Sequence, residues 1–555
     1  MSRVTFLPDQ ISIVVEPGTT ILAAARLAGV LIEAPCNGAG HCGKCAVRVP
    51  PEQVAAVTIP PGQQLPPERE AAGWLLACHA EVRGEVTVHV PARTESGLQI
   101  ITTGQKRRSV AVSPWISKRF DPETYQTFVY AGERLLTVER GDTTAELCGV
   151  VVDIGTTTLV VALVDLRTGK ELASASALNP QSLHAQDVLS RIRFSAAPGG
   201  LAQLQSELLA ELNRLIAGLT ATAGVSRAWI YEAVFSGNTC MLHLAAGVDP
   251  APLGKYPFTP TLTGGNHLAA ADLGLAIAVT GLVYLPPVIS AYVGADITAG
   301  ILAAELNELT GTTLFIDIGT NGEMILASDG LLAATSTAAG PAFEGMNISC
   351  GMRAAAGAIE EVRITAAGAV ALEVIGNGAV TGICGSGLMD LVAELVGSGV
   401  IGATGKFTAA ERLPAPLGSR IEKENGSTQF RVTETISLSQ KDVRQVQLAK
   451  GAIRAGIDIL LDERGVPAAE VDRVFIAGSF GFHLREESLL TLGLLPPETA
   501  GKVSFLGNTS QSGGELLLLS DRLRVELEAL TADVERVELT GRADFDRIFM
   551  KAMGF

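Results

Sequence analysis

Four cysteines near the beginning of the chain have the number and spacing of iron–sulfur ligands. Cys36, Cys42, Cys45 and Cys78 follow the pattern C-x5-C-x2-C-x32-C, and glycines separate the first three. Four thiolates can hold a 2Fe–2S cluster, and loop glycines let backbone N–H groups turn toward the sulfur atoms. Plant-type ferredoxins have four residues between the first two cysteines, whereas this chain has five. The pattern predicts a 2Fe–2S site with a modified first spacing.

A structural zinc site is the alternative use of four cysteines. Zinc ribbons usually pair two C-x2-C knuckles, whereas this chain has one knuckle, at Cys42 and Cys45. The C-x2-C-x2-C-x3-C-P run of 4Fe–4S proteins is absent. The remaining cysteines lie in apolar or glycine-rich segments and are interpreted as buried thiols: Cys148, Cys240, Cys350 and Cys384.

Two segments about 164 residues apart carry a second kind of chemistry. Each is an apolar strand that ends in Asp-Ile-Gly-Thr, at Asp153 and Asp317, followed by an alternating strand and a hairpin turn. The glycine permits a tight turn, and the hydroxyl, amide and backbone N–H groups after it can face phosphate oxygens. The predicted phosphate-binding residues are Gly155, Thr156, Thr157, Gly319, Thr320 and Asn321.

The two aspartates are the predicted catalytic pair. We expect Asp153 and Asp317 to face each other across a cleft, to hold Mg²⁺ through waters and to orient an attacking water. A third strand, in VDRVFIAGSFGFH, ends in a glycine turn whose predicted contacts with adenosine come from Gly478, Ser479 and Gly481. The alternative is a non-catalytic sheet scaffold that uses only the turns.

These residues need elements to position them. Residues 3–15 alternate as two short strands, residues 19–29 have a threonine cap, helix formers and a glycine stop, and strands follow around 45–49 and 74–90. That order predicts a β-grasp domain around the cysteine loop. The later strand–turn–strand repeats predict a duplicated α/β domain.

Composition and charge exclude several classes. A chain of 555 residues exceeds one core and predicts several domains. The net charge of −16 argues against nucleic acid or an anionic membrane as partner. The first ten residues lack the apolar core of a signal peptide, which predicts a cytoplasmic protein. Residues 273–295 are uncharged and long enough to span a bilayer, but two prolines and three glycines favour buried strands and turns.

The three glycine turns resemble those of the acetate/sugar kinase, heat-shock protein and actin superfamily, although the third lacks the usual pair of adjacent glycines. With the cysteine domain, the chain resembles the iron–sulfur, ATP-dependent reductive activators of corrinoid proteins. The resemblance covers residues 1–93 and 146–555 and includes the segments SGNTCMLHLAAGVDPAPLGKYPF, ISAYVGADITAGILA, STAAGPAFEG, GMRAAAGAI, GICGSGLMDL and LGNTS.

The resemblance implies a fold, cofactors and partners. It implies a 2Fe–2S ferredoxin-like domain (residues 1–93), a shortened linker or middle segment (94–145) and a two-lobed, actin-like ATPase domain with RNase H-like sheets (146–555). The implied activity passes one electron from the cluster to cobalt(II) of a corrinoid protein, restoring cobalt(I) for methyl transfer with ATP and Mg²⁺. An upstream low-potential reductant and a homodimer are also implied. The alternatives are a kinase or ATPase of this fold with an appended 2Fe–2S redox sensor, or an electron-transfer adaptor.

Overall fold

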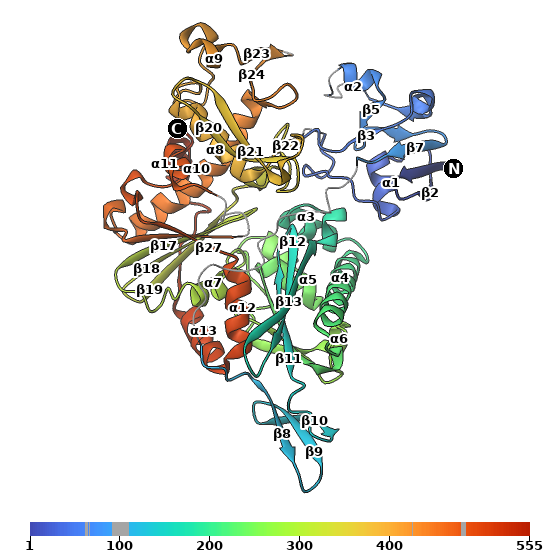
Figure 1. Ribbon diagram of the computed structural model, residues 1–555, viewed down its shortest axis with the longest axis vertical. Helices are drawn as coiled ribbons and strands as arrows, with labels where there is room; N and C mark the ends of the chain where they lie inside the picture. The colour runs from blue at the N-terminus through green and yellow to red at the C-terminus, as the bar shows by residue number, and fades with distance from the viewer. Residues whose placement is uncertain (41, 61–64, 66, 92–109, 425, 479–483) are drawn as a thin grey trace.

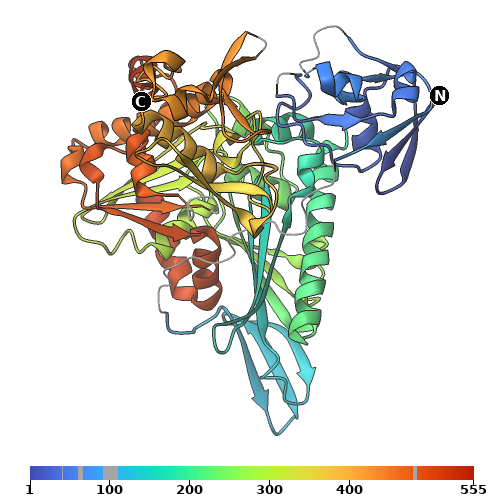
Figure 2. The same cartoon turned by 45° about the horizontal axis from the view of Figure 1, so that its top comes forward.

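The computed structural model describes the 555-residue chain apart from residues 41, 61–64, 66, 92–109, 425 and 479–483. The described parts form an N-terminal domain, a small three-stranded sheet and two larger α/β lobes (Figure 1). The N-terminal domain lies beside both lobes, at the end of the molecule opposite the small sheet (Figures 1 and 2).

The N-terminal domain is a five-stranded mixed sheet with one main helix. Its strand order is β2-β1-β7-β3-β5, in which β1 pairs antiparallel with β2 and parallel with β7. Thr20 caps the helix by accepting a hydrogen bond from the Ala23 N–H. This arrangement confirms the predicted β-grasp fold. Its elements are β1 (Ser2–Leu7), β2 (Ile11–Val15), α1 (Ile21–Leu27), β3 (Ala46–Arg48), β4 (Val57–Thr58), α2 (Pro67–Ala71), β5 (Trp74–Leu76), β6 (Glu81–Val82) and β7 (Val86–His89).

The segment assigned to a linker, residues 94–145, contains a folded antiparallel sheet. Its strands are β8 (Ile116–Asp121), β9 (Gln126–Ala131) and β10 (Arg134–Arg140). Alternate residues of β9 are buried, as a sheet with one covered face requires. Glu139 on β10 accepts hydrogen bonds from Lys118 at 2.6 Å and from Tyr231 of the first lobe, which attaches the sheet to that lobe.

The two lobes repeat one sheet topology. The first sheet has the order β13-β12-β11-β14-β16-β15, and the second has the order β27-β26-β17-β18-β19-β28. In each, the strand before the Asp-Ile-Gly-Thr turn pairs antiparallel with the next strand and parallel with a later one: β11 with β12 and β14, and β17 with β18 and β26. The predicted duplication is therefore confirmed.

The strands of the first sheet are β11 (Cys148–Ile154), β12 (Thr158–Asp165), β13 (Lys170–Leu178), β14 (Ile230–Gly237), β15 (Asn266–Ala269) and β16 (Leu282–Leu285). Those of the second are β17 (Thr312–Ile318), β18 (Gly322–Ser328), β19 (Leu331–Thr337), β26 (Arg473–Ala477), β27 (Val503–Gly507) and β28 (Glu535–Arg536). Their apolar residues form the lobe cores, together with helices α4 (Gly200–Ala223) on the first sheet and α10 (Gln440–Glu463) on the second.

Two helices at the junction of the lobes pack closely. Helix α7 (Ala295–Ala303) belongs to the first lobe, and α12 (Thr509–Leu519) follows β27 of the second. A side-chain carbon at Gly513 would lie 2.0 Å from the Ala299 carbonyl oxygen. Only glycine fits at this crossing, so the two helices tie the lobes together at backbone distance.

The remaining elements cover the sheets or extend the second lobe. The helices are α3 (Val188–Ser195), α5 (Thr239–Ala246), α6 (Ala270–Leu273), α8 (Gly385–Gly397), α9 (Ala415–Gly418), α11 (Glu486–Thr491), α13 (Asp521–Asp533) and α14 (Phe545–Ala552). Two additional sheets are β20 (Ala358–Ile364), β21 (Val370–Val374) and β22 (Gly382–Ile383), then β23 (Ile421–Glu424), β24 (Ser427–Arg431) and β25 (Ser437–Ser439).

The uncharged run at residues 273–295 contributes to the first lobe. It contains β16, whose Val283, Tyr284 and Leu285 are buried in the sheet. Over the described part of the chain, no helix combines the length and apolar character needed to cross a bilayer.

A buried ion pair fastens the C-terminal helices to the first lobe. Glu232 on β14 is fully buried, and its two carboxylate oxygens accept from Arg524 on α13 at 2.7 and 2.8 Å. Burial opposes ionisation of Glu232, but the charge and hydrogen bonds of Arg524 outweigh it and lower the pKa of the carboxyl.

Glu232→Ala is expected to destabilise the protein by about 3–5 kcal/mol, because it leaves the Arg524 charge buried without its partner. The thermal midpoint of the first lobe should fall by roughly 10 °C, measured by scanning calorimetry. Asp533→Asn removes an exposed carboxylate from the same helix and serves as the control. Equal midpoints for the two variants would contradict the assigned role of the pair.

Candidate functional site

The four predicted ligand cysteines lie close together as two pairs. The Sγ atoms of Cys36 and Cys42 are 3.2 Å apart, and the Cys45 and Cys78 side chains are joined by a hydrogen bond. A tetrahedral zinc site needs four ligands on one centre, whereas a 2Fe–2S cluster takes two ligands on each iron. The paired arrangement fits the cluster.

Strand pairing brings the distant fourth cysteine to the loop. Cys45 directly precedes β3, and Cys78 follows β5 two residues after its end. Because β3 and β5 are antiparallel, with Ala46 opposite Leu76, the two cysteines meet at the same end of this strand pair. Of the other four cysteines, three are buried as expected, and Cys350 is partly exposed.

The cysteine loop contacts both lobes. The Asn37 amide donates to the Asp187 carboxylate at 2.7 Å and to the Ser190 hydroxyl at 2.8 Å, both in the first lobe. The Lys44 ammonium donates to the Gly351 carbonyl at 2.7 Å and to the Ser349 carbonyl at 3.2 Å, in the second lobe. Both anchors lie within the ligand loop, so the predicted cluster is held against the two-lobed body.

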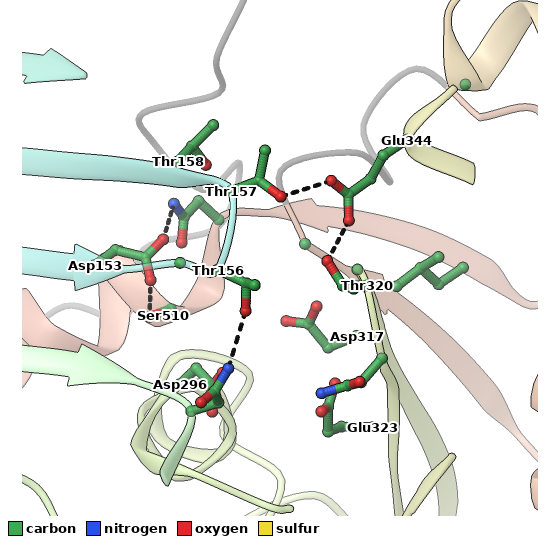
Figure 3. Close-up of a pocket in the computed structure, with 18 of the residues that line it drawn as sticks. Asp153, Thr156, Thr157, Thr158, Asp296, Asp317, Thr320, Glu323, Glu344 and Ser510 are labelled. Atoms are coloured by element: carbon green, nitrogen blue, oxygen red, sulfur yellow. Dashed lines mark hydrogen bonds between the residues drawn. The ribbon is translucent and has the colours of Figure 1, made fainter. Parts of the chain in front are cut away.

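The second predicted site is a cleft between the lobes (Figure 3). The repeated turns supply its walls, and the predicted residues that line it are Asp153, Gly155, Thr156, Thr157, Asp317, Gly319, Thr320, Asn321 and Gly478. Ser479 and Gly481, also predicted for adenosine, lie outside the described residues. Gly478 has a positive φ of 100°, and a side-chain carbon there would lie 2.8 Å from the Asp317 carboxylate. Only glycine allows this strand end to approach Asp317.

Asp153 is fixed by residues of the crossing helix. Its carboxylate accepts from the Asn508 amide and the Ser510 hydroxyl, each at 2.8 Å (Figure 3). Asn508 also caps α12 by accepting from the Gln511 N–H. Burial raises the pKa of Asp153, and these two hydrogen bonds work in the opposite direction.

Two further acidic groups, Asp296 on α7 and Glu323 on β18, line the same cleft as Asp317. Burial and the charge of Asp153 raise the pKa of Asp317 to about 7. Burial, Asp317 and Asp153 raise the pKa of Asp296 to about 8, and burial with Asp296 and Asp317 raises that of Glu323 well above its usual value. Such mutual repulsion favours a cation in the cleft.

This cluster is expected to make the metal-free protein less stable as pH rises. A raised carboxyl pKa stabilises the fold below the ordinary value near 4, and the contribution is lost as pH rises through about 7 and 8. In EDTA, the thermal midpoint should therefore fall between pH 6 and pH 9, followed by fluorimetry. Asp317→Asn should flatten this decline. A midpoint that rises across this range would contradict the assigned electrostatics.

Glu344 bridges the two repeated turns. One carboxylate oxygen accepts from the Thr157 hydroxyl at 2.8 Å and the other from the Thr320 hydroxyl at 2.5 Å (Figure 3). A carboxylate thus accepts from the same hydroxyl donors that the sequence assigned to phosphate oxygens. An anion held by both turns is therefore compatible with the donor chemistry of the cleft.

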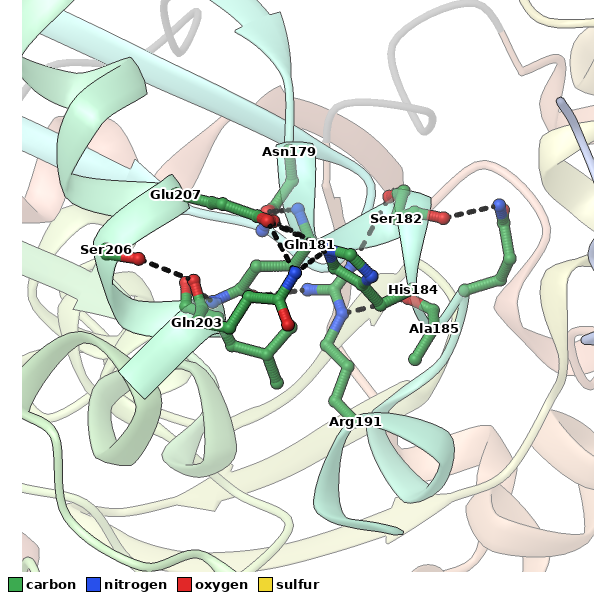
Figure 4. A network of polar contacts seen from close by, with 11 residues as sticks. Asn179, Gln181, Ser182, His184, Ala185, Arg191, Gln203, Ser206 and Glu207 are labelled. Atoms are coloured by element: carbon green, nitrogen blue, oxygen red, sulfur yellow. Dashed lines mark hydrogen bonds and ion pairs between the residues drawn. The ribbon is translucent and has the colours of Figure 1, made fainter. Parts of the chain in front are cut away.

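A buried arginine supports the first turn from behind. Arg191 on α3 donates to the Thr156 carbonyl. It also donates to the Ala185 carbonyl at 3.1 Å and to the Gln181 amide oxygen at 3.0 Å (Figure 4). Burial lowers the pKa of this guanidinium to about 10, which leaves it charged at neutral pH. Helix α3 begins at the Asp187 cap, which Asn37 of the cysteine loop contacts.

Sequence reasoning missed several cleft residues that lie outside the two Asp-Ile-Gly-Thr turns. They are Asn238, Asp296, Glu323, Glu344, Arg353, Asn508 and Ser510. A usable signal existed for some of them, because Asn238 and Asn508 directly follow apolar strands and cap the next helices. Asp296 and Glu344 had no local signal of function.

Family models match three consecutive parts of the chain. A 2Fe–2S iron–sulfur cluster binding domain matches residues 4–83, the RACo middle region matches 148–309, and the C-terminal domain of RACo, described as the ASKHA domain, matches 311–555. A solved structure, titled reductive activator for corrinoid, iron–sulfur protein, is 31% identical with a TM-score of 0.72, covering 100% of this chain and 98% of that one. The chain belongs to the family of reductive activators of corrinoid proteins.

Two curated relatives agree with this membership. The corrinoid activation enzyme RamQ of Eubacterium limosum is 29% identical, covering 94% of both chains. The Co(II) methylated amine-specific corrinoid protein reductase of Methanosarcina barkeri is 28% identical, covering 69% of this chain and 73% of the relative. In this activator family the N-terminal match supports an iron–sulfur cluster, and the ASKHA match supports ATP binding.

Proposed function

We propose that this protein reductively activates a corrinoid protein with the use of ATP. The substrate is cobalt(II) in the partner's corrinoid, which accepts one electron to become cobalt(I), and the reduced cluster loses that electron. The observation that carries the proposal is the seating of the four-cysteine loop on both lobes of the nucleotide fold, through Asn37 and Lys44. One chain thereby joins an electron carrier to an ATP-driven two-lobed body.

The cysteine pairs assign the ligands of the 2Fe–2S cluster. Cys36 and Cys42 would hold one iron, and Cys45 and Cys78 would hold the other. When bound, the cluster would store one electron at a reduction potential of about −400 mV, which is typical of plant-type centres. The protein's part is to fix the thiolates and to present them at the body through the loop.

In the cleft, the repeated turns take the phosphate groups of ATP. Backbone and hydroxyl donors of Thr156, Thr157 and Thr320 would face phosphate oxygens, together with Gly155, Gly319 and Asn321. We assign Mg²⁺ to the carboxylates of Asp153, Asp296 and Asp317, through waters, because their repulsion needs a cation. Asp317 would also orient the attacking water. Gly478, with Ser479 and Gly481 from the sequence, would lie on the adenosine side.

A need for ATP follows from the size of the potential gap. Reduction of cobalt(II) demands a stronger reductant than a plant-type cluster, and moving one charge through 100 mV costs about 2.3 kcal/mol. A gap of one or two hundred millivolts therefore costs a few kcal/mol. Closure of the two lobes around ATP gives a two-state element able to couple that cost to hydrolysis.

We also propose an electron donor, an oligomeric state and a cellular location. A low-potential ferredoxin, flavodoxin or reductase would supply the electron, the chain would act as a homodimer, and its place would be the cytoplasm. The test is to reduce the purified protein, mix it with a cobalt(II) corrinoid protein and record the cobalt absorption. Cobalt(I) is expected only with Mg-ATP. Equal yield with and without ATP would refute ATP-driven activation, and phosphorylation of a small molecule would instead identify a kinase.

A further inference from the structure

Arg353 lies where the nucleotide cleft meets the N-terminal domain. Its side chain lines the cleft, and its Nη1 atom lies 3.2 Å from the Glu33 carboxylate of the N-terminal domain. Its Nε atom is buried and has no hydrogen-bond partner among the residues that the structure describes. The Arg353 side chain therefore lines the cleft and contacts the N-terminal domain, and its Nε donor is not satisfied by the described residues.

The partner that Arg353 now has is a weak one. The Glu33 side chain is 51% exposed, against 16% for Arg353, and a carboxylate so open to water contributes little to an ion pair. Phosphate carries more charge than a carboxylate and matches the planar fork of a guanidinium. A nucleotide phosphate in the cleft would therefore compete well with Glu33.

Loss of the Glu33 contact would loosen the whole docked domain. Lys44 donates to the carbonyls of Ser349 and Gly351, which lie four and two residues before Arg353 in the same segment. The side-chain oxygen of Asn37 accepts a hydrogen bond from the backbone N–H of Gln186 in the first lobe, at 3.1 Å. Movement of the Arg353 segment, or of one lobe relative to the other, changes the spacing between these anchors.

We propose that Arg353 exchanges Glu33 for a phosphate of ATP, so that nucleotide binding releases the cysteine loop from the two-lobed body. This inference rests on the proposed nucleotide site. Release frees the predicted cluster to approach the corrinoid partner, and docking competes with ATP for one guanidinium. Because such coupling is reciprocal, mutations that weaken docking must strengthen ATP binding.

Two variants that break the same ion pair separate this role from a structural one. Glu33→Gln frees Arg353 and should tighten Mg-ATP binding by up to about fivefold, the worth of an exposed ion pair. Arg353→Gln removes the phosphate ligand and should weaken binding by roughly tenfold or more. Calorimetric titration of the cluster-loaded protein measures both. Glu85→Gln, at an exposed position of the same domain, is the matched control.

The amide of Gln186 reports docking directly. Its N–H donates to Asn37 of the cysteine loop, so release should expose it to exchange. Hydrogen exchange at Gln186 should accelerate when adenylyl-imidodiphosphate is added to the wild type and should not respond to it in Arg353→Gln. Asn37→Gly provides the undocked reference, because Asn37 has a φ of 52° that glycine accepts without strain.

The outcomes distinguish this inference from the proposed function. If Glu33→Gln and Arg353→Gln shift ATP affinity in the same direction, or if Gln186 exchange ignores the nucleotide, Arg353 does not couple the two sites. If the wild type binds no nucleotide at all, the proposed nucleotide site fails and the inference fails with it. Visible absorption of the cluster confirms that each variant is loaded.

Discussion

Replacing Cys42 with alanine is expected to abolish electron transfer to a cobalt(II) corrinoid protein while ATP binding stays within about twofold of the wild type. Cys42 is paired with Cys36 at 3.2 Å, in the arrangement that gives each iron two thiolates. Alanine removes one ligand and leaves that iron with an open position. The cleft that binds nucleotide is built by the two lobes and contains none of the four ligand cysteines.

The measurement combines three readouts on one preparation. Visible absorption and electron paramagnetic resonance of the reduced protein should lose the 2Fe–2S signature, cobalt(I) should not form with Mg-ATP, and calorimetric titration should still detect ATP. Cys148→Ala, which removes a buried thiol at the start of β11, should keep all three. A Cys42→Ala protein that still reduced cobalt at the wild-type rate would exclude the assigned cluster as the electron source.

Asp317→Asn is expected to have the complementary effect. ATP hydrolysis should fall by about 10²–10⁴-fold, the range lost with a positioned proton-transfer group, while the cluster spectrum is unchanged. Asparagine keeps the shape of the side chain but removes the charge assigned to Mg²⁺ and to the attacking water. The change also relieves repulsion with Asp153 and Asp296. The variant should therefore be inactive and at the same time more stable without metal.

Loss of hydrolysis together with a gain in stability would show that Asp317 serves catalysis and does not stabilise the fold. Hydrolysis is measured as phosphate release in the presence of the corrinoid protein, and stability as the thermal midpoint in EDTA at pH 8. Asp329→Asn provides the control, because Asp329 lies in a turn of the same lobe and asparagine tolerates its φ of 48°. Hydrolysis by Asp317→Asn close to that of the control would remove Asp317 from the catalytic assignment.

Cys42→Ala tests the N-terminal domain, and Asp317→Asn tests the nucleotide cleft. Loss of the cluster should leave nucleotide chemistry, and loss of the carboxylate should leave the cluster. Neither variant alone reports how the domain and the cleft are coupled. The coupling is addressed by Arg353 and Glu33, whose side chains join the cleft to the N-terminal domain.

The predicted ligand cysteines, the repeated turns and the fold class follow from patterns in the sequence. Cys36, Cys42 and Cys45 share one loop, and each Asp-Ile-Gly-Thr turn follows an apolar strand and begins a hairpin. Such patterns are local, because side-chain spacing, strand alternation and glycine turns act within about ten residues. They could be interpreted before any long-range contact was known.

Which distant segments meet at the cleft depends on the packing of the sheets and lobes. Asp296, Glu344 and Arg353 come from segments without a local signature, and they reach the cleft because two sheets of the same topology pack across α7 and α12. The small sheet within residues 94–145 and the docking of Asn37 and Lys44 on opposite lobes were equally invisible in the sequence. The docking contacts join residues more than a hundred positions apart, where strand order and lobe packing, rather than local pattern, fix the neighbours.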